Sequence, residues 1–312
     1  MRYIKKSASH LFFTIKERYQ FMQGHKEQWS IEEMAKTLEV SRSGYYRFLK
    51  AKPSVRESQS LALLTKIRVI HKESRETYGS PCIHAQLQEE GESCSRKRVA
   101  KLMKKFRIEA KMNKRFKKTT CANPKAIAAP NLLQQQFKAE KPNEKWVADL
   151  TYVATGEGWL YVATVLDLFS RRIVGLAMSE RMTADLVSQA LQQALIHRKP
   201  PANLLHHSDK GSQYTSGQFL SLLRANNIIP SMSGTGNCFD NAAMESFYHT
   251  LKTEHVYFES YKSRQEAKQS IFEYVEVFYN RKRKHSTLGY CAPMVFEENW
   301  RKQKNISLLT VH

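Results

Sequence analysis

The chain has 312 residues, of which 41% are hydrophobic, so it is long enough for about two or three domains with buried cores and is not a disordered chain. No apolar run approaches the roughly 20 residues that span a bilayer, and the apolar stretch near Leu11 is too short for a signal peptide. The five cysteines are scattered without a Cys-x-x-Cys pair, so we expect reduced thiols in a cytoplasmic protein.

The charge is strongly positive and is concentrated in the N-terminal part. Lys and Arg number 50 against 29 Asp and Glu, which gives a net charge of +21. Residues 1–140 hold 30 basic and 13 acidic residues, whereas residues 141–312 hold 20 and 16. This excess predicts a polyanionic partner, and nucleic acid is the usual one, although a merely soluble basic protein can have the same balance.

Residues 1–55 contain a helix-turn-helix pattern. Apolar residues recur at helical spacing from Leu11 to Met22, and Ser30 with Glu33 forms a capping box for a following helix. Ser41 can cap a second helix after a tight turn. That helix would present five side chains to a DNA groove, namely Arg42, Ser43, Tyr45, Tyr46 and Arg47, of which Arg42, Tyr45 and Arg47 are the candidate contacts. Any small helical hairpin would show the same pattern, so DNA reading stays an interpretation here.

Residues 56–118 predict a second helical region of the same kind, with helices over 60–74, 80–91 and 96–106. Ser80-Pro81 and Ser95 mark two of the helix starts. The last helix and its tail hold twelve Lys and Arg residues against one acid, Glu109. Their mutual repulsion favours contact with phosphates over a solvated basic face. The candidate DNA contacts are Arg96, Lys97, Arg98, Lys101, Lys104 and Lys105.

Residues 119–142, which contain three prolines and a run of three glutamines, predict a linker. Beyond it, β-rich runs at 146–154, 159–168 and 172–178 predict an antiparallel meander. Helices are expected over 183–197, 216–226, 241–253 and 264–280, with short strands at 204–207 and 228–231. This order predicts an α/β domain with a mixed sheet over 143–300, preceded by the all-α regions and followed by a C-terminal tail, 301–312.

Three carboxylates stand out in this α/β domain. Asp149 lies inside the first strand, Asp209 ends the fourth, and Glu245 lies in the helix over 241–253. If strands one and four are neighbours, Asp149 and Asp209 come together and the helix can bring Glu245 over them. Crowded carboxylates attract divalent cations, and their hard oxygens suit Mg²⁺. Two such ions, roughly 3.5–4 Å apart, serve phosphoryl transfer, so a basic chain with this cluster points to chemistry on nucleic acid.

Several strings of the sequence together resemble the insertion-sequence transposases of the IS3 family, which have a DDE integrase core. The strings are WVADLTY at 146–152, DLFSRRIVG at 167–175, HHSDKGSQY at 206–214, GNCFDNAAMESF at 236–247 and YNRKRKHSTLGYCAP at 279–293. The resemblance implies an RNase H-like catalytic domain in which Asp149, Asp209 and Glu245 are catalytic and bind two Mg²⁺ ions, with Mn²⁺ as a substitute. It also gives Lys252 a contact with the DNA end.

The resemblance further implies a bacterial DNA transposase that binds the terminal repeats of its element, cuts one strand at each end and joins the freed 3′-OH to target DNA. The expected partners are this DNA, further copies of the chain, and an upstream-frame helix-turn-helix protein, because Met1 and the length resemble the downstream product of a frameshift pair. We expect it in the cytoplasm at the nucleoid and not at a membrane. The alternatives are a nuclease of the same fold that only hydrolyses, and a DNA-binding regulator with an inactive core.

The roles of several further residues stay open at this point. Asp167 matches the family and reads as a structural residue. His206 and His207 could approach the metals or DNA, or could pack within the strand. Asp240 could be a fourth metal ligand or could, with Asn237 and Asn241, shape the loop and cap the helix of Glu245. Two cations near the C-terminus are candidate phosphate contacts, Arg281 and Arg283.

Overall fold

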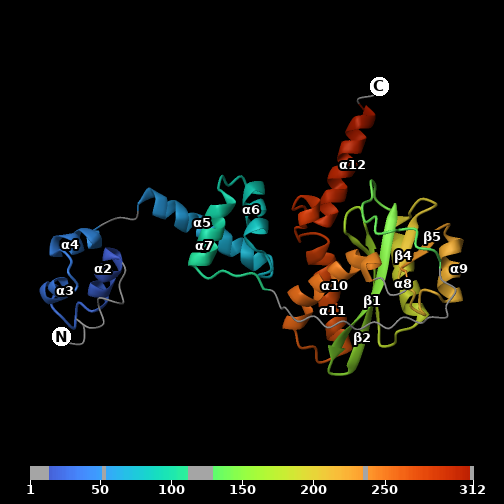
Figure 1. Ribbon diagram of the computed structural model, residues 1–312, viewed down its shortest axis with the longest axis horizontal. Helices are drawn as coiled ribbons and strands as arrows, with labels where there is room; N and C mark the ends of the chain where they lie inside the picture. The colour runs from blue at the N-terminus through green and yellow to red at the C-terminus, as the bar shows by residue number, and fades with distance from the viewer. Residues whose placement is uncertain (1–13, 51–53, 112–128, 235–237, 310–312) are drawn as a thin grey trace. The chain divides into compact units, whose positions relative to one another are not determined.

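The computed structural model describes residues 14–50, 54–111, 129–234 and 238–309 (Figure 1). The chain divides into two compact units, residues 1–65 and residues 66–312, which are described separately. The first part of the expected linker, 119–128, the basic residues between 112 and 118, and Asn237 lie outside the described ranges. Within those ranges, no helix has the length and apolar character needed to cross a bilayer.

Three short helices form the N-terminal unit: α2 (Ile15–Gly24), α3 (Ile31–Thr37) and α4 (Arg42–Lys50). They enclose a small core that includes Met22, Met34 and Tyr45. The Ser30 hydroxyl accepts a hydrogen bond from the Glu33 amide and donates one to the Glu33 carboxylate. The capping box is therefore incomplete, because the carboxylate takes the hydroxyl proton instead of the Ser30 N–H. Two helices joined by a tight turn, α3 and α4, are present as expected.

The second helical region consists of α5 (Val55–Glu73), α6 (Ser80–Glu89) and α7 (Arg96–Lys105). α5 begins five residues before the expected start, because the Ser54 hydroxyl accepts from the Glu57 amide and caps it there. Ser95 caps α7 in the same way, through the Arg98 amide. Val99, Leu102 and Met103 are buried on one side of α7, which leaves its cations on the other side.

The C-terminal part is built on a mixed five-stranded sheet, as predicted, with the RNase H-like arrangement (Figure 1). Its strands are β1 (Lys145–Thr155), β2 (Gly158–Asp167), β3 (Ile173–Ser179), β4 (Leu205–Ser208) and β5 (Ile229–Met232), in the order β3-β2-β1-β4-β5. The first three strands form an antiparallel meander, and β4 then pairs parallel with β1. The register of that pair sets Val147 opposite His207.

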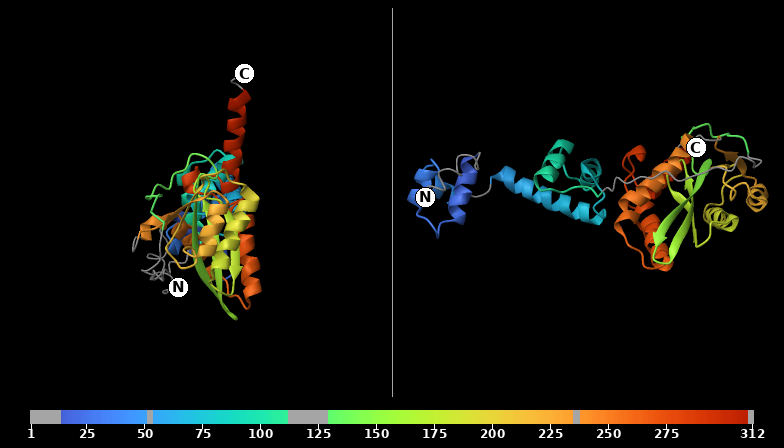
Figure 2. Two further views of the ribbon diagram at one scale, coloured as in Figure 1. Left: turned by 90° about the vertical axis from the view of Figure 1, so that its right-hand side faces the viewer. Right: turned by 60° about the horizontal axis from the view of Figure 1, so that its bottom comes forward.

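Helices cover both faces of the sheet (Figures 1 and 2). α8 (Ala184–Arg198) and α9 (Gly217–Ala225) pack on one face, over a core with Trp146, Ala148 and Leu191. α10 (Ala242–Glu254) and α11 (Arg264–Phe272) lie on the other face. Because successive strand residues point to opposite faces, Asp149 and its cross-strand partner Thr164 point toward α10.

Three segments differ from the expected boundaries. The helix expected over 264–280 changes after α11 into a π-helix, η3 (Glu273–Tyr279). The expected tail 301–312 begins inside a continuous helix, α12 (Pro293–Leu309). Residues 130–137, expected in the linker, are packed on the sheet domain: Leu133 is buried, and its amide and that of Leu132 donate to the Ser231 hydroxyl. Buried apolar contacts therefore set these boundaries where composition alone suggested a linker and a tail.

Candidate active site

Asp149 is the innermost of the three candidate carboxylates. Its backbone carbonyl accepts a 2.6 Å hydrogen bond from the Tyr248 hydroxyl of α10, and one carboxylate oxygen accepts from the Leu150 amide at 2.8 Å. The pKa of Asp149 is raised to about 8, chiefly by burial and then by the negative charges of Asp209 and Glu245. The carboxyl group is therefore placed where its charge is poorly solvated and surrounded by like charge.

Asp209 follows directly after β4. Since β4 is parallel to β1 with Val147 opposite His207, Asp149 and Asp209 each lie two residues further along adjacent strands. The Gly211 amide donates to the Asp209 carboxylate at 2.9 Å, and a Cβ atom at residue 211 would lie 3.0 Å from that same oxygen. The glycine thus lets the loop close tightly on the carboxylate. Burial raises the pKa of Asp209 as well.

Glu245 lies in the first turn of α10 and is exposed. Two contacts fix α10 against β1, since Asn241 Nδ2 donates to the Ala148 carbonyl at 3.2 Å and Tyr248 donates to Asp149. Within the described residues, no three His, Cys, Asp or Glu side chains lie close enough together to hold a metal ion.

Lys252 lies two turns beyond Glu245 in α10. Its ammonium group is 5.2 Å from the centre of the Tyr152 ring, and that ring in turn packs edge-on against Trp159, with ring centres 4.8 Å apart. Burial lowers the pKa of Lys252, whereas the charge of Asp149 raises it. The lysine is thus a partly buried cation beside the Tyr152 ring and in the field of Asp149.

The two histidines of β4 are packing residues in this structure. His206 is buried against the Phe219 ring, with ring centres 5.4 Å apart, and burial lowers its pKa to about 3. His207 lies between the hydroxyls of Ser231 and Ser233, and burial lowers its pKa to about 4. Both imidazoles are therefore neutral at pH 7.

Asp240 holds the loop before α10 in place. Its carboxylate accepts hydrogen bonds from Asn131 Nδ2, Gln135 Nε2 and the Gly234 amide, at 2.8–3.0 Å. The expectation that Asn241 caps α10 is wrong, because its side chain makes no capping bond and reaches Ala148 instead. These two residues therefore fix the loop and the start of α10 against the sheet.

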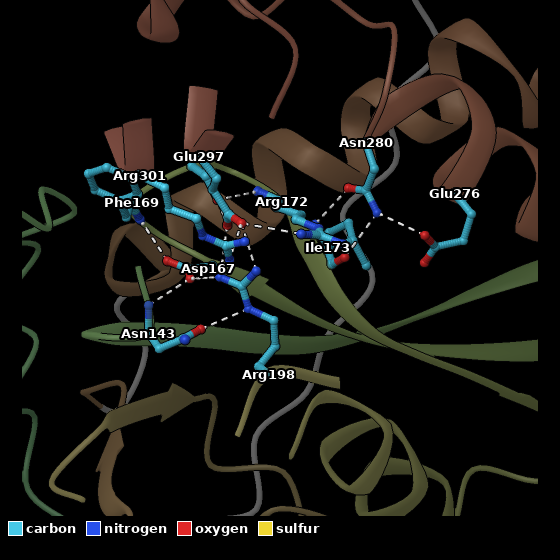
Figure 3. A network of polar contacts seen from close by, with 11 residues as sticks. Asn143, Asp167, Phe169, Arg172, Ile173, Arg198, Glu276, Asn280, Glu297 and Arg301 are labelled. Atoms are coloured by element: carbon cyan, nitrogen blue, oxygen red, sulfur yellow. Dashed lines mark hydrogen bonds and ion pairs between the residues drawn. The ribbon is translucent and has the colours of Figure 1, made fainter. Parts of the chain in front are cut away.

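Asp167 belongs to a buried polar network at the end of β2 (Figure 3). It accepts from the amides of Asn143 and Phe169 and from Arg198 Nη2 at 3.1 Å. Glu297 of α12 accepts from Arg198 at 2.7 and 2.8 Å and from Arg172 at 3.2 Å. The network joins β2, α8 and α12, which gives Asp167 a structural position.

The candidate DNA contacts fall into two groups. Most are exposed, namely Arg42 and Arg47 on α4, Arg96, Lys97, Lys101, Lys104 and Lys105 on α7, and Arg281, while Arg98 is half-buried. Two are core residues instead. Tyr45 is 1% exposed because its position on α4 faces the helical core, whereas its neighbour Tyr46 is 51% exposed. Arg283 forms two hydrogen bonds with the Glu254 carboxylate, at 2.7 and 2.8 Å, so its charge is already satisfied.

Sequence reasoning did not single out Tyr248, although it lies three residues after Glu245. Its hydroxyl joins α10 to the strand that carries Asp149 and accepts a hydrogen bond from Thr164 at 2.8 Å. A tyrosine at helical spacing from other apolar residues looks like an ordinary core position. The contact depends on which strand the helix crosses, so no local sequence pattern predicts it.

Comparison with known proteins identifies relatives over most of the chain. Residues 139–238 and 245–300 match two integrase core domain families, and residues 58–116 match an HTH-like domain family. The 31 kDa protein of insertion element IS600 from Shigella sonnei is 45% identical over 267 residues, which are 86% of this chain and 98% of that protein. Transposase InsF for insertion sequence IS3A from Escherichia coli (strain K12) is 38% identical over 282 residues, 90% of this chain and 98% of the relative.

Solved structures with a similar fold are more distant. The trimeric form of the HTLV-2 integrase catalytic core domain in complex with magnesium is 14% identical, with a TM-score of 0.41. The match covers 51% of this chain and 99% of the integrase chain. The catalytic core domain of BIV integrase is 18% identical, with a TM-score of 0.39, and the match covers 52% of this chain and 99% of the integrase chain.

Proposed function

This chain belongs to the IS3 family of insertion-sequence transposases and is a DNA transposase, and we propose that Asp149, Asp209 and Glu245 are its catalytic carboxylates and bind divalent metal ions. The observation that carries this proposal is the parallel pairing of β1 with β4, which sets Asp149 and Asp209 at equivalent positions, while Tyr248 anchors the helix of Glu245 to Asp149. The raised pKa of Asp149, to which Asp209 and Glu245 contribute, agrees with it. Side chains that lie on β1, after β4 and on α10 act on one another there, as a shared site requires.

The donor set fits Mg²⁺, with Mn²⁺ as a substitute, because all three groups offer hard carboxylate oxygens. A half-buried carboxyl group whose pKa lies far above its ordinary value gains most from a nearby cation, which favours the ionised form. When bound, two such ions would activate an attacking oxygen and stabilise the leaving oxygen of a phosphodiester. The protein's own residues position the carboxylates and the DNA.

Those residues hold the carboxylates in place. Tyr248 fixes the backbone of Asp149, and the Gly211 amide orients the Asp209 carboxylate. Lys252 holds a backbone phosphate of the element end, and the exposed cations of α4 and α7 bind the terminal repeats. Further copies of the chain on the same DNA and an upstream-frame helix-turn-helix protein complete the assembly in the bacterial cytoplasm.

The reaction has two phosphoryl transfers. Hydrolysis of one phosphodiester at the element end leaves a 3′-OH and a 5′-phosphate. The oxygen of that 3′-OH then attacks a phosphodiester of the target, forms a new P–O bond and releases a target 3′-OH, with the proton of the attacking hydroxyl lost to solvent.

The experiment that tests this function uses the full chain, a labelled duplex with the terminal sequence of its own element, and Mg²⁺. We expect a strand nicked at the element end and, with an added target duplex, a joined product. Nicking without joining would support a nuclease that only hydrolyses. Specific binding without either product would support a DNA-binding regulator.

A further inference from the structure

A small pocket beside the start of α10 carries cationic and hydroxyl groups. Its volume is about 230 Å³, which is below the roughly 300–1,000 Å³ of pockets that bind drug-sized ligands. Arg171 and His285 contribute nitrogen donors, and Ser246, Thr250 and Thr287 contribute hydroxyls. No aspartate or glutamate is among the described residues that line it. The pocket therefore suits a single small anionic group.

Arg171 is a half-buried cation without a counter-charge. Its guanidinium donates one hydrogen bond, from Nη2 to the Phe137 carbonyl at 3.3 Å. Over the described residues no carboxylate forms an ion pair with it, and the remaining residues of the chain include no aspartate or glutamate. Burial lowers its pKa. A buried charge is costly unless it is paired, so the site is electrostatically incomplete.

Other half-buried arginines of the same domain show what is missing at Arg171. Arg172, the next residue, pairs with Glu297, and Arg198 pairs with the same glutamate. Arg283 pairs with Glu254. The fold thus supplies an acid to each of these three, whereas Arg171 points into a cavity.

Two neighbouring features favour an anion in that cavity. Ala242 and Ala243, in the first turn of the 13-residue helix α10, line it, and the N-terminal end of a helix carries partial positive charge. The His285 Nδ1 atom lies 2.9 Å from the Thr287 hydroxyl. Burial lowers the pKa of His285 to about 4, and the positive charges of Arg283 and Arg171 contribute to the shift.

We propose that this pocket binds one phosphodiester group of the DNA backbone, away from the bond that is cut, and thereby positions the strand beside Glu245. Guanidinium, hydroxyl and helix-terminus groups are the usual partners of a phosphate. Ser246 lines the pocket and directly follows Glu245 in α10, so the pocket lies within one helical turn of the third candidate carboxylate. This inference rests on the proposed function, and Arg171 is a positioning residue in it.

The first test measures anion binding by the full chain in EDTA, with inorganic phosphate as the probe. Phosphate is expected to raise the melting temperature of the wild type in a saturable manner. Arg171→Met, which keeps the length of the stem, should weaken phosphate binding about tenfold or more, and Arg171→Lys by less. Arg224→Met removes the same charge from an exposed position on α9 and should bind like the wild type. Equal binding by Arg171→Met and the wild type would overturn the inference.

A second arm identifies the source of the phosphate. A short duplex of unrelated sequence should compete with inorganic phosphate for the wild type and much less for Arg171→Met. Phosphate binding that DNA does not displace would mean a site for a free anion and would overturn the DNA assignment. A loss of stability in phosphate-free buffer as large as that of Arg198→Met, with unchanged phosphate binding, would show a structural role instead.

The third arm separates this inference from the proposed function. In Mg²⁺, Arg171→Met should raise the DNA concentration needed for half-maximal nicking about tenfold, with a smaller effect on the maximal rate. If the wild type nicks element ends and Arg171→Met needs the same DNA concentration for half-maximal nicking, the inference is overturned and the proposed function stands. A wild type that nicks no element end overturns the proposed function, and the phosphate measurements then decide this pocket independently.

Discussion

The ammonium group of Lys252 lies 5.2 Å from the centre of the Tyr152 ring. This contact holds the lysine beside Tyr152 of β1, in the field of Asp149, instead of leaving it free in solvent. A cation held in one place by an aromatic ring is suited to receive a phosphate of the DNA end, because little side-chain entropy remains to be lost on binding.

Charge reversal by Lys252→Glu should cut nicking and joining at the element end by about tenfold or more, since a charge-assisted contact with phosphate is lost. Raising the Mg²⁺ concentration should not restore activity, because no carboxylate has been removed. Lys302→Glu, at an exposed position of α12, is the matched control. Full rescue by metal would mean that Lys252 tunes the metal site.

Each of Asp149→Asn, Asp209→Asn and Glu245→Gln should reduce nicking by roughly a thousandfold or more while leaving binding of the element end within a few-fold of wild type. The amide keeps the shape of the side chain but loses the anionic oxygen, and metal-ion stabilisation is worth several kcal/mol. Glu298→Gln, on the exposed side of α12, should have no effect. Near-normal nicking by any one of the three variants would remove that residue from the ligand set.

The salt dependence of DNA binding should report the cations of α7. Lys101 and Lys104 are exposed there, and each phosphate contact contributes about −0.9 to the slope of log K against log salt concentration. Lys101→Ala with Lys104→Ala should therefore make the slope shallower by about 1.8. Lys302→Ala should leave it unchanged. A slope unaffected by the double variant would place the DNA contacts elsewhere.

Loss of the Glu297 charge should destabilise the sheet domain. Glu297→Gln leaves Arg172 without an acid and leaves Arg198 with Asp167 alone, and removal of one partner of a buried ion pair costs about 3–5 kcal/mol. Thermal or urea unfolding of the full chain measures this. Glu298→Gln, one residue along α12, should change the free energy of unfolding by less than about 0.5 kcal/mol. Similar stability of the two variants would mean that the network in Figure 3 contributes little.

The same variant should show a defined pH dependence. Hydrogen bonds and charge from Arg198 lower the pKa of Glu297 below its ordinary value of 4.5, although burial opposes this. A carboxylate with a lowered folded-state pKa adds stability that is fully present above its unfolded pKa and is lost as the pH falls through the folded value. Asp167, whose pKa is raised to about 6 by burial with a contribution from the Glu297 charge, titrates above pH 5, so the test uses the range below it. There the stability difference between wild type and Glu297→Gln should shrink as the pH falls below about 4.5. A difference that grows on acidification would contradict this.

The sequence by itself determined the order of the elements and singled out three carboxylates as candidates. The alternation along β1 follows from its apolar pattern, whereas the approach of Asp149 to Asp209 was expected only if strands one and four are neighbours, and the parallel pairing of β1 with β4 meets that condition. The basic side of α7 was also predictable, because its buried residues recur at helical spacing. These features are local, and local patterns are what a single sequence records.

Only the tertiary structure decided which charged and polar groups are satisfied. Tyr45 and Tyr46 are adjacent on α4, and packing alone decides that the first is buried and the second is exposed. Arg283 and Arg171 cannot be told apart by sequence pattern, yet Arg283 forms an ion pair with Glu254 and Arg171 lines a cavity. The energy of a charge depends on its burial and on the distance to its partner, and those are fixed by residues far apart in the chain, as Arg198 and Glu297 are across 99 positions.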